Sequence, residues 1–341
     1  MTILERLATH GHEQVIAFQD SRSGLRGFLA IHSTRRGPAL GGTRVMRYAG
    51  EDDALEDALR LSRAMTLKCA LAELPAGGGK AVIIERRGFK RRAALEVFGA
   101  VVETLGGRFH TGPDIGIGPA DLEAIGRGTS HVARENDPRL GDIGQHTAIG
   151  VAHAMRACLE IAGIAPRGAR VAIQGVGSVG AWLARILAEA GCMVAVADVD
   201  ESLARRIARE VDGTVIPAGR VLSAPCDVFA PCALGGVLSA RTIPKLRARI
   251  VCGAANNQLD SAADGERLAR RRILYAPDFL ANAGGVIRGA EYYLLRRASS
   301  WETIERIHER MLRVASLAAP RNASTARVAE ALAESRLRRA K

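Results

Sequence analysis

Long apolar runs are absent from this chain of 341 residues. No stretch reaches the roughly 18 to 20 apolar residues that cross a bilayer, and the N-terminus lacks the apolar core of a secretory signal. Hydrophobic residues still make up 48% of the chain, which is enough to build a folded core. We therefore expect a soluble, cytoplasmic protein, and the length favours two domains with a cleft between them.

Aromatic residues are also scarce, at 4% of the chain, although the net charge is +12. A basic surface attracts polyanions, so this charge raises the question of nucleic-acid binding. The arginines are spread over the whole length, however, and no motif interleaves them with aromatic side chains. Solvated helix faces explain them better, and we expect neither a nucleic acid nor a membrane as a partner.

Cysteine pairs with the two-residue spacing of zinc or redox sites are missing as well. The six cysteines are scattered, mostly among apolar neighbours, at positions 69, 158, 192, 226, 232 and 252. We expect reduced thiols in the core, and the sequence predicts no metal site.

Lysine is rare in this basic chain. Only five of the 48 basic residues are lysines, at positions 68, 80, 90, 245 and 341, and the other 43 are arginines. Arginine practically never loses its proton in a protein, whereas a desolvated lysine can. Lys68 and Lys80 are therefore candidates for chemistry that a guanidinium cannot perform.

Strand-like and helix-like stretches alternate in the first part of the chain. Residues 27–33 and 80–84 have the composition of strands, and residues 51–71 carry apolar side chains at helical spacing after an acidic start. A polar stretch near residues 134–145, rich in turn formers, predicts a hinge. This part predicts a first domain of mixed α/β structure over residues 1–134.

A regular repeat of strand and helix follows the hinge. The segments ARVAIQG, CMVAVAD, CDVFAPC and ARIVCGA each carry a short apolar run, as in a doubly wound parallel sheet. We assign residues 145–314 to this second, Rossmann-type domain. Residues 315–341 are assigned to a C-terminal helical segment that packs back toward the hinge.

The strongest local motif is the run Gly175-Val176-Gly177-Ser178-Val179-Gly180, which lies between a predicted strand and a predicted helix. Such glycines permit a tight turn and a close approach of the backbone to a pyrophosphate, which the helix N-terminus attracts. Asp198 ends the next strand, where a carboxylate binds ribose hydroxyls and repels the 2′-phosphate of NADP. The unit therefore predicts a dinucleotide site that prefers NAD.

Two short segments carry the candidate lysines. Lys68 ends the predicted helix, and Lys80 follows three glycines. This glycine run is not a phosphate loop, because Leu74 stands where that motif needs glycine and Ala81 where it needs Ser or Thr. We expect instead a partly buried Lys80 whose pKa is lowered by a second cation, Lys68, so that it accepts a proton near neutral pH. The alternative is a pair of solvated lysines.

Asp114 lies in a loop of small residues, His110-Thr111-Gly112-Pro113-Asp114-Ile115-Gly116. A carboxylate there can exchange a proton with an amine. A turn or a helix cap is the alternative role for this residue.

With these residues the chain resembles the Glu/Leu/Phe/Val dehydrogenase family, closest to its leucine, valine and phenylalanine members. The resemblance covers nearly the whole chain. Its matching stretches are His12-Glu13-Gln14, GPALGGTR (37–44), the two lysine segments, Pro113-Asp114-Ile115-Gly116, the glycine run, APCALG (230–235), GAANNQ (253–258), and Ala276-Pro277-Asp278 with Asn282-Ala283-Gly284-Gly285. The resemblance implies an NAD-dependent enzyme that converts an apolar L-amino acid reversibly to its 2-oxo acid and ammonia, without a metal.

The resemblance also implies roles for individual residues. Lys80 would activate water to attack the imino carbon, Asp114 would move protons on the substrate nitrogen, and Lys68 would hold the substrate carboxylate. Further substrate contacts are implied at Gly41, Gly42, Met65 and Asn256, with a side-chain pocket at Leu40, Gly112, Val286 and Gly289. Cofactor contacts are implied at the glycine run, Asp198, Thr147, Arg44, Cys232, Ala233, Ala255 and Asn256.

Several points depart from the family's pattern or stay open. The hinge segment 133–145 is a little shorter than in leucine dehydrogenases, and Ile117-Gly118 replaces a pair of small polar residues. Gly289 stands where branched-chain enzymes carry a larger residue, so phenylalanine or tryptophan is the alternative substrate to leucine or valine. A catalytically silent nucleotide-binding homologue is the alternative from another class, and a nucleic-acid-binding protein is the third.

The family resemblance implies a homo-oligomer, either a dimer or an octamer. It also implies that the N-terminal domain serves substrate binding, catalysis and oligomerisation.

Overall fold

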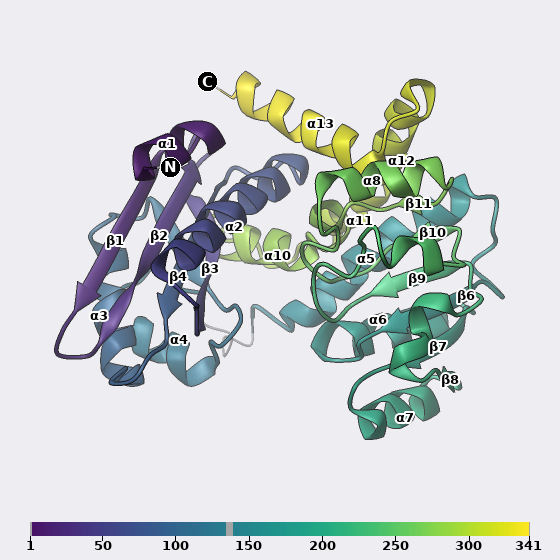
Figure 1. Ribbon diagram of the computed structural model, residues 1–341, viewed down its shortest axis with the longest axis horizontal. Coiled ribbons are helices and arrows are strands. Elements are labelled where there is room, and N and C mark those ends of the chain that lie inside the picture. Colours follow the sequence, from purple (N-terminus) through teal and green to yellow (C-terminus); the bar gives the residue numbers. More distant parts are fainter. Residues whose placement is uncertain (1, 134–138, 341) are drawn as a thin grey trace. The chain divides into compact units, whose positions relative to one another are not determined.

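The computed structural model describes residues 2–133 and 139–340, which form two compact units (Figure 1). Within the described part, unit 1 takes its residues from 1–141, 289–298 and 333–341, and unit 2 from 142–288 and 299–332. Two C-terminal segments of the chain therefore belong to the N-terminal unit. Each unit has its own β-sheet.

Unit 1 is built on a five-stranded mixed sheet with the strand order β1-β2-β4-β3-β5. Antiparallel pairing joins β1 to β2 and β2 to β4, whereas β3 is parallel to β4 and to β5. The strands are β1 (Gln14–Asp20), β2 (Leu25–Ser33), β3 (Ala39–Met46), β4 (Gly77–Ile84) and β5 (Phe109–Gly112). This sheet confirms the mixed α/β fold that was predicted for the N-terminal part.

Helices cover both faces of this sheet (Figure 1). On one face, α2 (Glu51–Leu71) buries Leu55 and Leu59 against Val82 of β4. On the other face, α3 (Arg91–Glu103) and α4 (Pro119–Ile125) enclose a core around Phe98 and Phe109, and α1 (Ile3–His10) precedes β1. The predicted helix 51–71 is confirmed; its acidic first turn and Lys68 in its last turn both complement the helix dipole.

Strand β4 begins earlier than the predicted strand 80–84, because the three glycines before Lys80 are themselves part of the strand. All eight residues of β4 are buried. A Cβ on Gly78 would collide with the backbone nitrogen of Thr66 in α2, and a Cβ on Gly79 would lie 2.7 Å from the ring of Phe109. Gly78 therefore lets helix α2 approach the sheet closely, and Gly79 makes room for the Phe109 ring on the other face, just before Lys80.

Unit 2 contains a six-stranded sheet in which every pair of neighbouring strands is parallel, in the order β11-β10-β9-β6-β7-β8. Its strands are β6 (Arg170–Gln174), β7 (Met193–Ala197), β8 (Thr214–Val215), β9 (Val228–Pro231), β10 (Ile250–Val251) and β11 (Leu274–Tyr275). The chain order reverses between β6 and β9, as in a doubly wound sheet. The predicted Rossmann-type fold is confirmed.

The helical elements of unit 2 begin with α5 (Ile143–Ile161), α6 (Ser178–Glu189) and α7 (Glu201–Glu210). They continue with η1 (Ala218–Ser223), η2 (Ile243–Lys245), α8 (Ala262–Arg270), α9 (Asp278–Ala281), α10 (Gly284–Tyr293), α11 (Trp301–Glu305), α12 (Ile307–Ala318), η3 (Ala319–Arg321) and α13 (Thr325–Arg339). The ends of α10 and α13 belong to unit 1.

The predicted hinge at 134–145 overlaps the first turn of α5. Asp142 caps this helix, because its Oδ1 accepts hydrogen bonds from the backbone of Gly144 (2.7 Å) and Gln145 (3.2 Å). Residues 134–138 lie outside the described residues. The end of the expected hinge is therefore regular helix.

The last turns of α13 lie on the end of α2. Arg336 donates a hydrogen bond to the carbonyl oxygen of Leu71 (2.7 Å) and forms an ion pair with Glu73 (2.7 Å). Arg63 and Glu334 form a second ion pair across the same helices (3.0 Å). The C-terminal helix thus contacts and stabilises the turn that follows Lys68.

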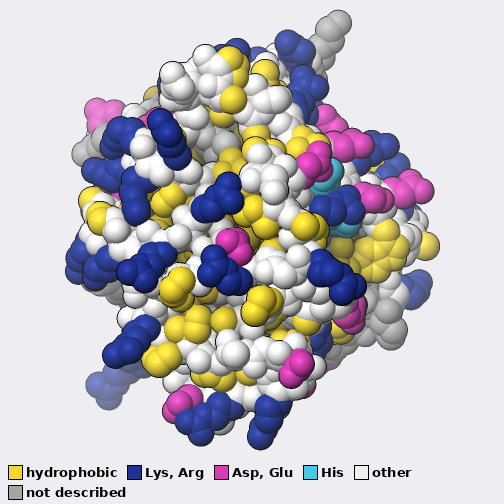
Figure 2. Space-filling model, turned by 90° about the vertical axis from the view of Figure 1, so that its right-hand side faces the viewer, with side chains coloured by type: hydrophobic (Ala, Val, Ile, Leu, Met, Phe, Trp, Pro, Cys, Tyr) yellow, Lys and Arg dark blue, Asp and Glu magenta, His cyan; other side chains and the backbone are white. Residues whose placement is uncertain are grey.

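Basic side chains do not form one continuous patch on the face of the molecule that Figure 2 shows. On the face shown in Figure 2, Lys and Arg side chains are interspersed with apolar and uncharged ones. Among the described residues, no helix combines the length and the apolar character that crossing a membrane requires.

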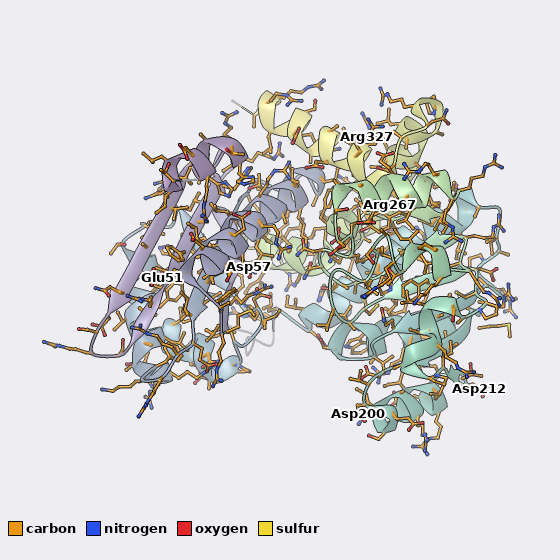
Figure 3. The ribbon with its side chains drawn as sticks, in the orientation of Figure 1. Glu51, Asp57, Asp200, Asp212, Arg267 and Arg327 are labelled. Carbon is orange, nitrogen blue, oxygen red and sulfur yellow. The ribbon has the colours of Figure 1, made fainter. Side chains whose placement is uncertain are left out.

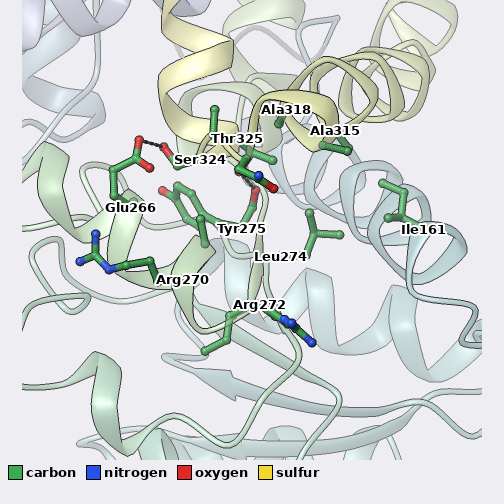
Figure 4. Close-up of a pocket in the computed structure, with 16 residues that line it drawn as sticks. Ile161, Glu266, Arg270, Arg272, Leu274, Tyr275, Ala315, Ala318, Ser324 and Thr325 are labelled. Carbon is green, nitrogen blue, oxygen red and sulfur yellow. Dashed lines mark hydrogen bonds between the residues drawn. The ribbon is translucent and has the colours of Figure 1, made fainter.

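A cavity of about 600 Å³ lies beside the edge strand β11 (Figure 4). Its walls come from the end of α8, from α12 and from the start of α13, with Leu274 and Thr325 among the lining residues. None of the site residues predicted from the sequence lines it. The predicted site residues therefore lie elsewhere in the fold.

Candidate active site

Lys80 and Asp114 form a close ion pair in unit 1. The Nζ atom of Lys80 lies 2.6 Å from Oδ2 of Asp114, and their side chains are only 8% and 16% exposed. Lys80 comes from the central strand β4, and Asp114 follows the edge strand β5. The structure thus brings together two of the three predicted catalytic residues; Lys80 is buried and Asp114 is half-buried.

Strand β3 lies between β4 and β5, and its residue next to Lys80 and Asp114 is a glycine, Gly42. Thr43 pairs with Ala81 and Gly42 pairs with Gly112, so Gly42 lies between Lys80 and the end of β5. A Cβ on Gly42 would lie 2.9 Å from Cβ of Asp114 and 2.5 Å from the carbonyl oxygen of Pro113. The glycine therefore creates the space that Asp114 occupies.

Arg44 is the third charged group of this cluster. Its Nε donates to Oδ2 of Asp114 (3.0 Å), and its Nη1 donates to Oδ2 of Asp57 in α2 (2.8 Å). Alternate residues of β3 face opposite sides of the sheet, so Gly42 and Arg44 share the side that α2 covers. Arg44 was predicted to lie close to the cofactor; in the structure its guanidinium links two carboxylates.

The pKa values of the pair follow from burial and charge. Burial lowers the pKa of Lys80 below its ordinary value; Asp114 opposes this shift, and the Arg44 cation adds to it. Burial alone would raise the pKa of Asp114, but Lys80 and Arg44 outweigh it, so this pKa lies below its usual range. Arg44 is thus a cation that lowers the pKa of Lys80; the same role was predicted for Lys68.

Lys68 is buried in the last turn of α2, at 8% exposure. Two residues before it, Thr66 lies against Gly78, which itself stands two residues before Lys80. The two predicted lysine segments therefore pack directly on each other. Met65, in the same turn of α2, is half-buried.

The other predicted substrate positions of unit 1 are Leu40 and Gly41 on β3, Gly112 on β5 and Gly289 on α10. Gly41 and Gly112 are buried, and Leu40 is half-buried. A Cβ on Gly112 would lie 3.3 Å from the Cβ of Ala133. Leu40 lies on β3 two residues before Gly42, and Gly112 lies on β5 two residues before Asp114. Both are therefore near the Lys80–Asp114 pair, as the predicted substrate pocket requires.

The predicted nucleotide motif has the expected form in unit 2. Gly175 begins the turn after β6 with φ +91°, and a Cβ on Gly180 would collide with the carbonyl oxygen of Gly175. Helix α6 starts at Ser178 without a side-chain cap, so its first backbone N–H groups have no partner within the helix. A Cβ on Gly177 would meet no described atom within 4 Å. This open, positively polarised helix end fits a pyrophosphate group.

Asp198 stands beside this turn at the end of β7. Its Oδ2 accepts the backbone N–H of Val176 (2.8 Å), and its Oδ1 accepts that of Asp200 (3.0 Å). The carboxylate is therefore fixed next to the glycine run, where the predicted ribose contact requires it.

The remaining predicted cofactor positions lie mostly at the same edge of the parallel sheet. Cys232 and Ala233 follow β9, and Ala255 and Asn256 follow β10, so all four stand at the carboxyl ends of strands. A Cβ on Gly175 would lie 2.7 Å from Cβ of Ala233, which places these loops in contact.

Asn256 and Thr147 are held by neighbouring groups of unit 2. Oδ1 of Asn256 accepts a hydrogen bond from Asn282 (2.9 Å), and the hydroxyl of Thr147 in α5 donates to the carbonyl oxygen of Ile143 (2.8 Å). Val286 is half-buried in α10. The contacts of these residues with a ligand stay predictions.

Three residues of the charged cluster, Asp57, Tyr48 and Arg60, were not predicted from the sequence. Asp57 receives hydrogen bonds from Arg44, from the hydroxyl of Tyr48 (2.7 Å) and from Arg60 (2.8 Å). The only signal in the sequence was the acidic start of the helix, which was interpreted as a helix signal alone. Which acidic residue faces Arg44 depends on how α2 lies on the sheet.

Comparisons with known families cover almost the whole chain. The family model for the "Glu/Leu/Phe/Val dehydrogenase, dimerisation domain" matches residues 12–131. The model for "Glutamate/Leucine/Phenylalanine/Valine dehydrogenase" matches residues 142–206 and 201–331. The chain belongs to the Glu/Leu/Phe/Val dehydrogenase family. It is an amino-acid dehydrogenase, an oxidoreductase that acts on CH–NH₂ groups and uses a nicotinamide cofactor.

Relatives within this family have different names. The chain is 40% identical to leucine dehydrogenase of Geobacillus stearothermophilus over 344 residues, 99% of this chain and 94% of the relative. It is 39% identical to L-tryptophan dehydrogenase of Nostoc punctiforme over 345 residues, 100% and 98% of the two chains. It is 41% identical to phenylalanine dehydrogenase of Thermoactinomyces intermedius over 303 residues, 85% and 81% of the two chains.

A solved structure of the family agrees with the two-domain fold. The crystal structure of L-tryptophan dehydrogenase from Nostoc punctiforme matches with a TM-score of 0.85 at 38% identity and covers 99% of both chains. The predicted family and the predicted fold class are both confirmed.

Proposed function

We propose that this dehydrogenase catalyses the NAD-dependent oxidative deamination of an apolar L-amino acid, of the leucine or valine type, to its 2-oxo acid and ammonia. The observation that carries the proposal is the buried Lys80–Asp114 pair, with 2.6 Å between Nζ and Oδ2. A primary amine whose pKa is lowered by burial can act as a base near neutral pH. This is the chemistry that the hydrolysis of an imino acid requires.

The residues of unit 1 divide the work of substrate handling. Lys68 pairs with the substrate carboxylate, helped by the backbone of Gly41 and Gly42. The nicotinamide, when bound, accepts a hydride from the α carbon of the amino acid. Lys80, in its uncharged form, takes a proton from a water molecule as that water attacks the imino carbon.

Asp114 completes the proton balance. Its ionised carboxylate accepts a proton from the substrate nitrogen and returns it as ammonia leaves, while Arg44 stabilises the charge of the carboxylate. Burial of the pair limits exchange of these protons with bulk water.

The preference for NAD over NADP rests on Asp198. Its carboxylate lies within hydrogen-bond reach of the glycine run, at 2.8 Å from the Val176 nitrogen. A negative charge there favours ribose hydroxyls and repels a 2′-phosphate.

An aromatic substrate is the second candidate. Two relatives of similar identity act, by their names, on tryptophan and phenylalanine. The glycines at positions 112 and 289 of the predicted side-chain pocket add space and favour this alternative. A glutamate substrate is disfavoured, because the sequence offers no further lysine for a side-chain carboxylate.

The test is the initial rate of NADH formation at alkaline pH with a panel of amino acids that includes leucine, valine, phenylalanine and tryptophan. We expect turnover with at least one apolar amino acid, a higher rate with NAD than with NADP, and little turnover with glutamate. No turnover with any of them would reject the proposal and favour the catalytically silent homologue.

Substitution of Lys80 tests the mechanism itself. Lys80→Arg keeps a positive charge but offers no neutral base, so it should abolish turnover while cofactor binding persists. Lys245→Arg, at an exposed position of unit 2, is the matched control and should keep full activity. Homo-oligomeric assembly, a cytoplasmic location and the domain roles stay predictions.

A further inference from the structure

We propose that Asp57 is a positioning residue for the reaction: its carboxylate orients and neutralises Arg44, so that Arg44 holds Asp114 in place beside Lys80. The proposal rests on the proposed function, because it concerns the same catalytic pair. It adds a residue for which the family resemblance supplied no role.

Asp57 is held on both of its oxygen atoms. Oδ2 accepts hydrogen bonds from Arg44 (2.8 Å) and Tyr48 (2.7 Å), and Oδ1 accepts one from Arg60 (2.8 Å). The donors come from β3, from the loop after β3 and from α2. Figure 3 shows Asp57 on α2, and its side chain is only 13% exposed. A half-buried carboxylate with three donors is a fixed charge in a fixed orientation.

Arg44 transmits that orientation to the catalytic pair. Its guanidinium is planar, so a carboxylate that binds Nη1 also sets the direction of Nε. Nε points to Oδ2 of Asp114 (3.0 Å), and the same oxygen lies 2.6 Å from Lys80. The chain of contacts from Asp57 through Arg44 and Asp114 therefore ends on the proposed base.

Helix α2 makes the arrangement rigid. Asp57 and Lys68 are eleven residues apart, which is about three helical turns or roughly 16 Å, so both side chains lie on the same face. One helix thus carries the anchor of Arg44 at one end and the proposed carboxylate-binding lysine at the other.

The charges around the pair determine how Lys80 responds to pH. The charged groups that act on Lys80 are Asp114 after β5, Arg44 from β3 and Asp57 from α2. Tyr48 and Arg60 in turn donate hydrogen bonds to Asp57. Asp57 is ionised: burial raises its pKa, but the hydrogen bonds from Tyr48 and Arg60 and the Arg44 charge outweigh this. Its negative charge in turn raises the pKa of Lys80.

The sign of the expected effect follows. Replacing Asp57 by Asn removes an anion that favours the protonated form of Lys80, so the pKa of Lys80 should fall. Removing Arg60 leaves the Asp57 charge less compensated, so the pKa of Lys80 should rise. Because Arg60 is 50% exposed, this second effect should be the smaller one.

The experiment measures kcat and KM against pH for Asp57→Asn, Arg60→Gln and the wild type. We expect Asp57→Asn to lower kcat about tenfold, with KM for the amino acid changed far less, and to move the half-maximal kcat/KM to lower pH by about half a unit. Arg60→Gln should move it to higher pH. The matched control is Asp53→Asn, which removes the same charge from an exposed position of the same helix. It should change neither kcat nor the pH of half-maximal kcat/KM.

A measurement without turnover separates this proposal from the proposed function. With lysine labelled at its ε position, the resonance that disappears in Lys80→Arg belongs to Lys80, and its titration is followed in each variant. Opposite shifts for Asp57→Asn and Arg60→Gln support the proposal even if no amino acid is turned over. An unchanged Lys80 titration in both variants, or the same shift in Asp53→Asn, overturns it. If Asp57→Asn does not fold, the upward shift in Arg60→Gln alone decides.

Discussion

Gly42 and Asp114 share one small volume beside Lys80. A Cβ on Gly42 would lie 2.9 Å from Cβ of Asp114, so the carboxylate reaches Lys80 only because position 42 carries no side chain. Backbone contact with the substrate was the role implied for Gly42 by the family resemblance. The structure shows a second reason for a glycine at position 42: a side chain there would displace Asp114 from Lys80.

Gly42→Ala should therefore displace Asp114 and reduce kcat. Misplacement of a reacting group by about 1 Å commonly costs about a hundredfold in rate, and we expect a loss of this size. Cofactor binding should persist, because the glycine run belongs to unit 2. Steady-state kinetics and a direct titration with NAD measure the two effects.

The matched control for this substitution is Gly219→Ala. Gly219 is exposed, and a Cβ there would meet no described atom within 4 Å. This control should keep wild-type kinetics. A Gly42→Ala enzyme as active as the control would show that Asp114 does not depend on the space at position 42.

Asp198→Asn should narrow the preference for NAD over NADP. The amide keeps the shape of the side chain but loses the charge that repels a 2′-phosphate, so the ratio of kcat/KM values should fall about tenfold, or about 1.4 kcal/mol. Asp212→Asn removes the same charge at an exposed position of unit 2 (Figure 3) and should leave the ratio unchanged. An unchanged ratio in Asp198→Asn would contradict the proposed ribose contact.

Acid should weaken unit 1 through a pair of histidines, of which His32 is buried and His12 half-buried. The rings of His12 and His32 lie 4.8 Å apart, and burial lowers the pKa of each to about 4. Between about pH 6.5 and pH 4 the unfolded chain binds protons that the folded chain does not, so stability falls as the pH falls through this window.

His32→Phe should reduce this acid sensitivity. The variant removes one titrating group, so the loss of unfolding free energy between pH 7.5 and pH 5 should be smaller by about 1–2 kcal/mol. Urea unfolding at the two pH values measures it. Equal losses in the variant and the wild type would mean that His32 does not titrate with folding.

The fold was accessible from the sequence because its signals are local and periodic. The helix 51–71 had both the apolar spacing and the acidic start, and the glycine run with Asp198 specified a strand–turn–helix–strand unit. Lys80 and Asp114 were found through residue type and family resemblance, and the structure brings them into contact.

The remaining features depend on contacts between distant segments. The role of Gly78 becomes visible only when α2 lies across β4. Arg44 is a second cation beside Asp114 because β3 lies between β4 and β5. Asp57 lies among several acidic residues at the start of α2, and only the packing of that helix selects it. Local sequence patterns contain none of this information.

The most direct test of the account is the titration of Lys80 in the wild-type protein. With only five lysines, ε-labelled protein gives a small set of resonances, and Lys80→Arg identifies the one that belongs to position 80. We predict that this resonance titrates below the ordinary lysine pKa of about 10.4, because burial lowers the pKa of Lys80. A Lys80 resonance that titrates at or above the ordinary lysine pKa would contradict the central claim.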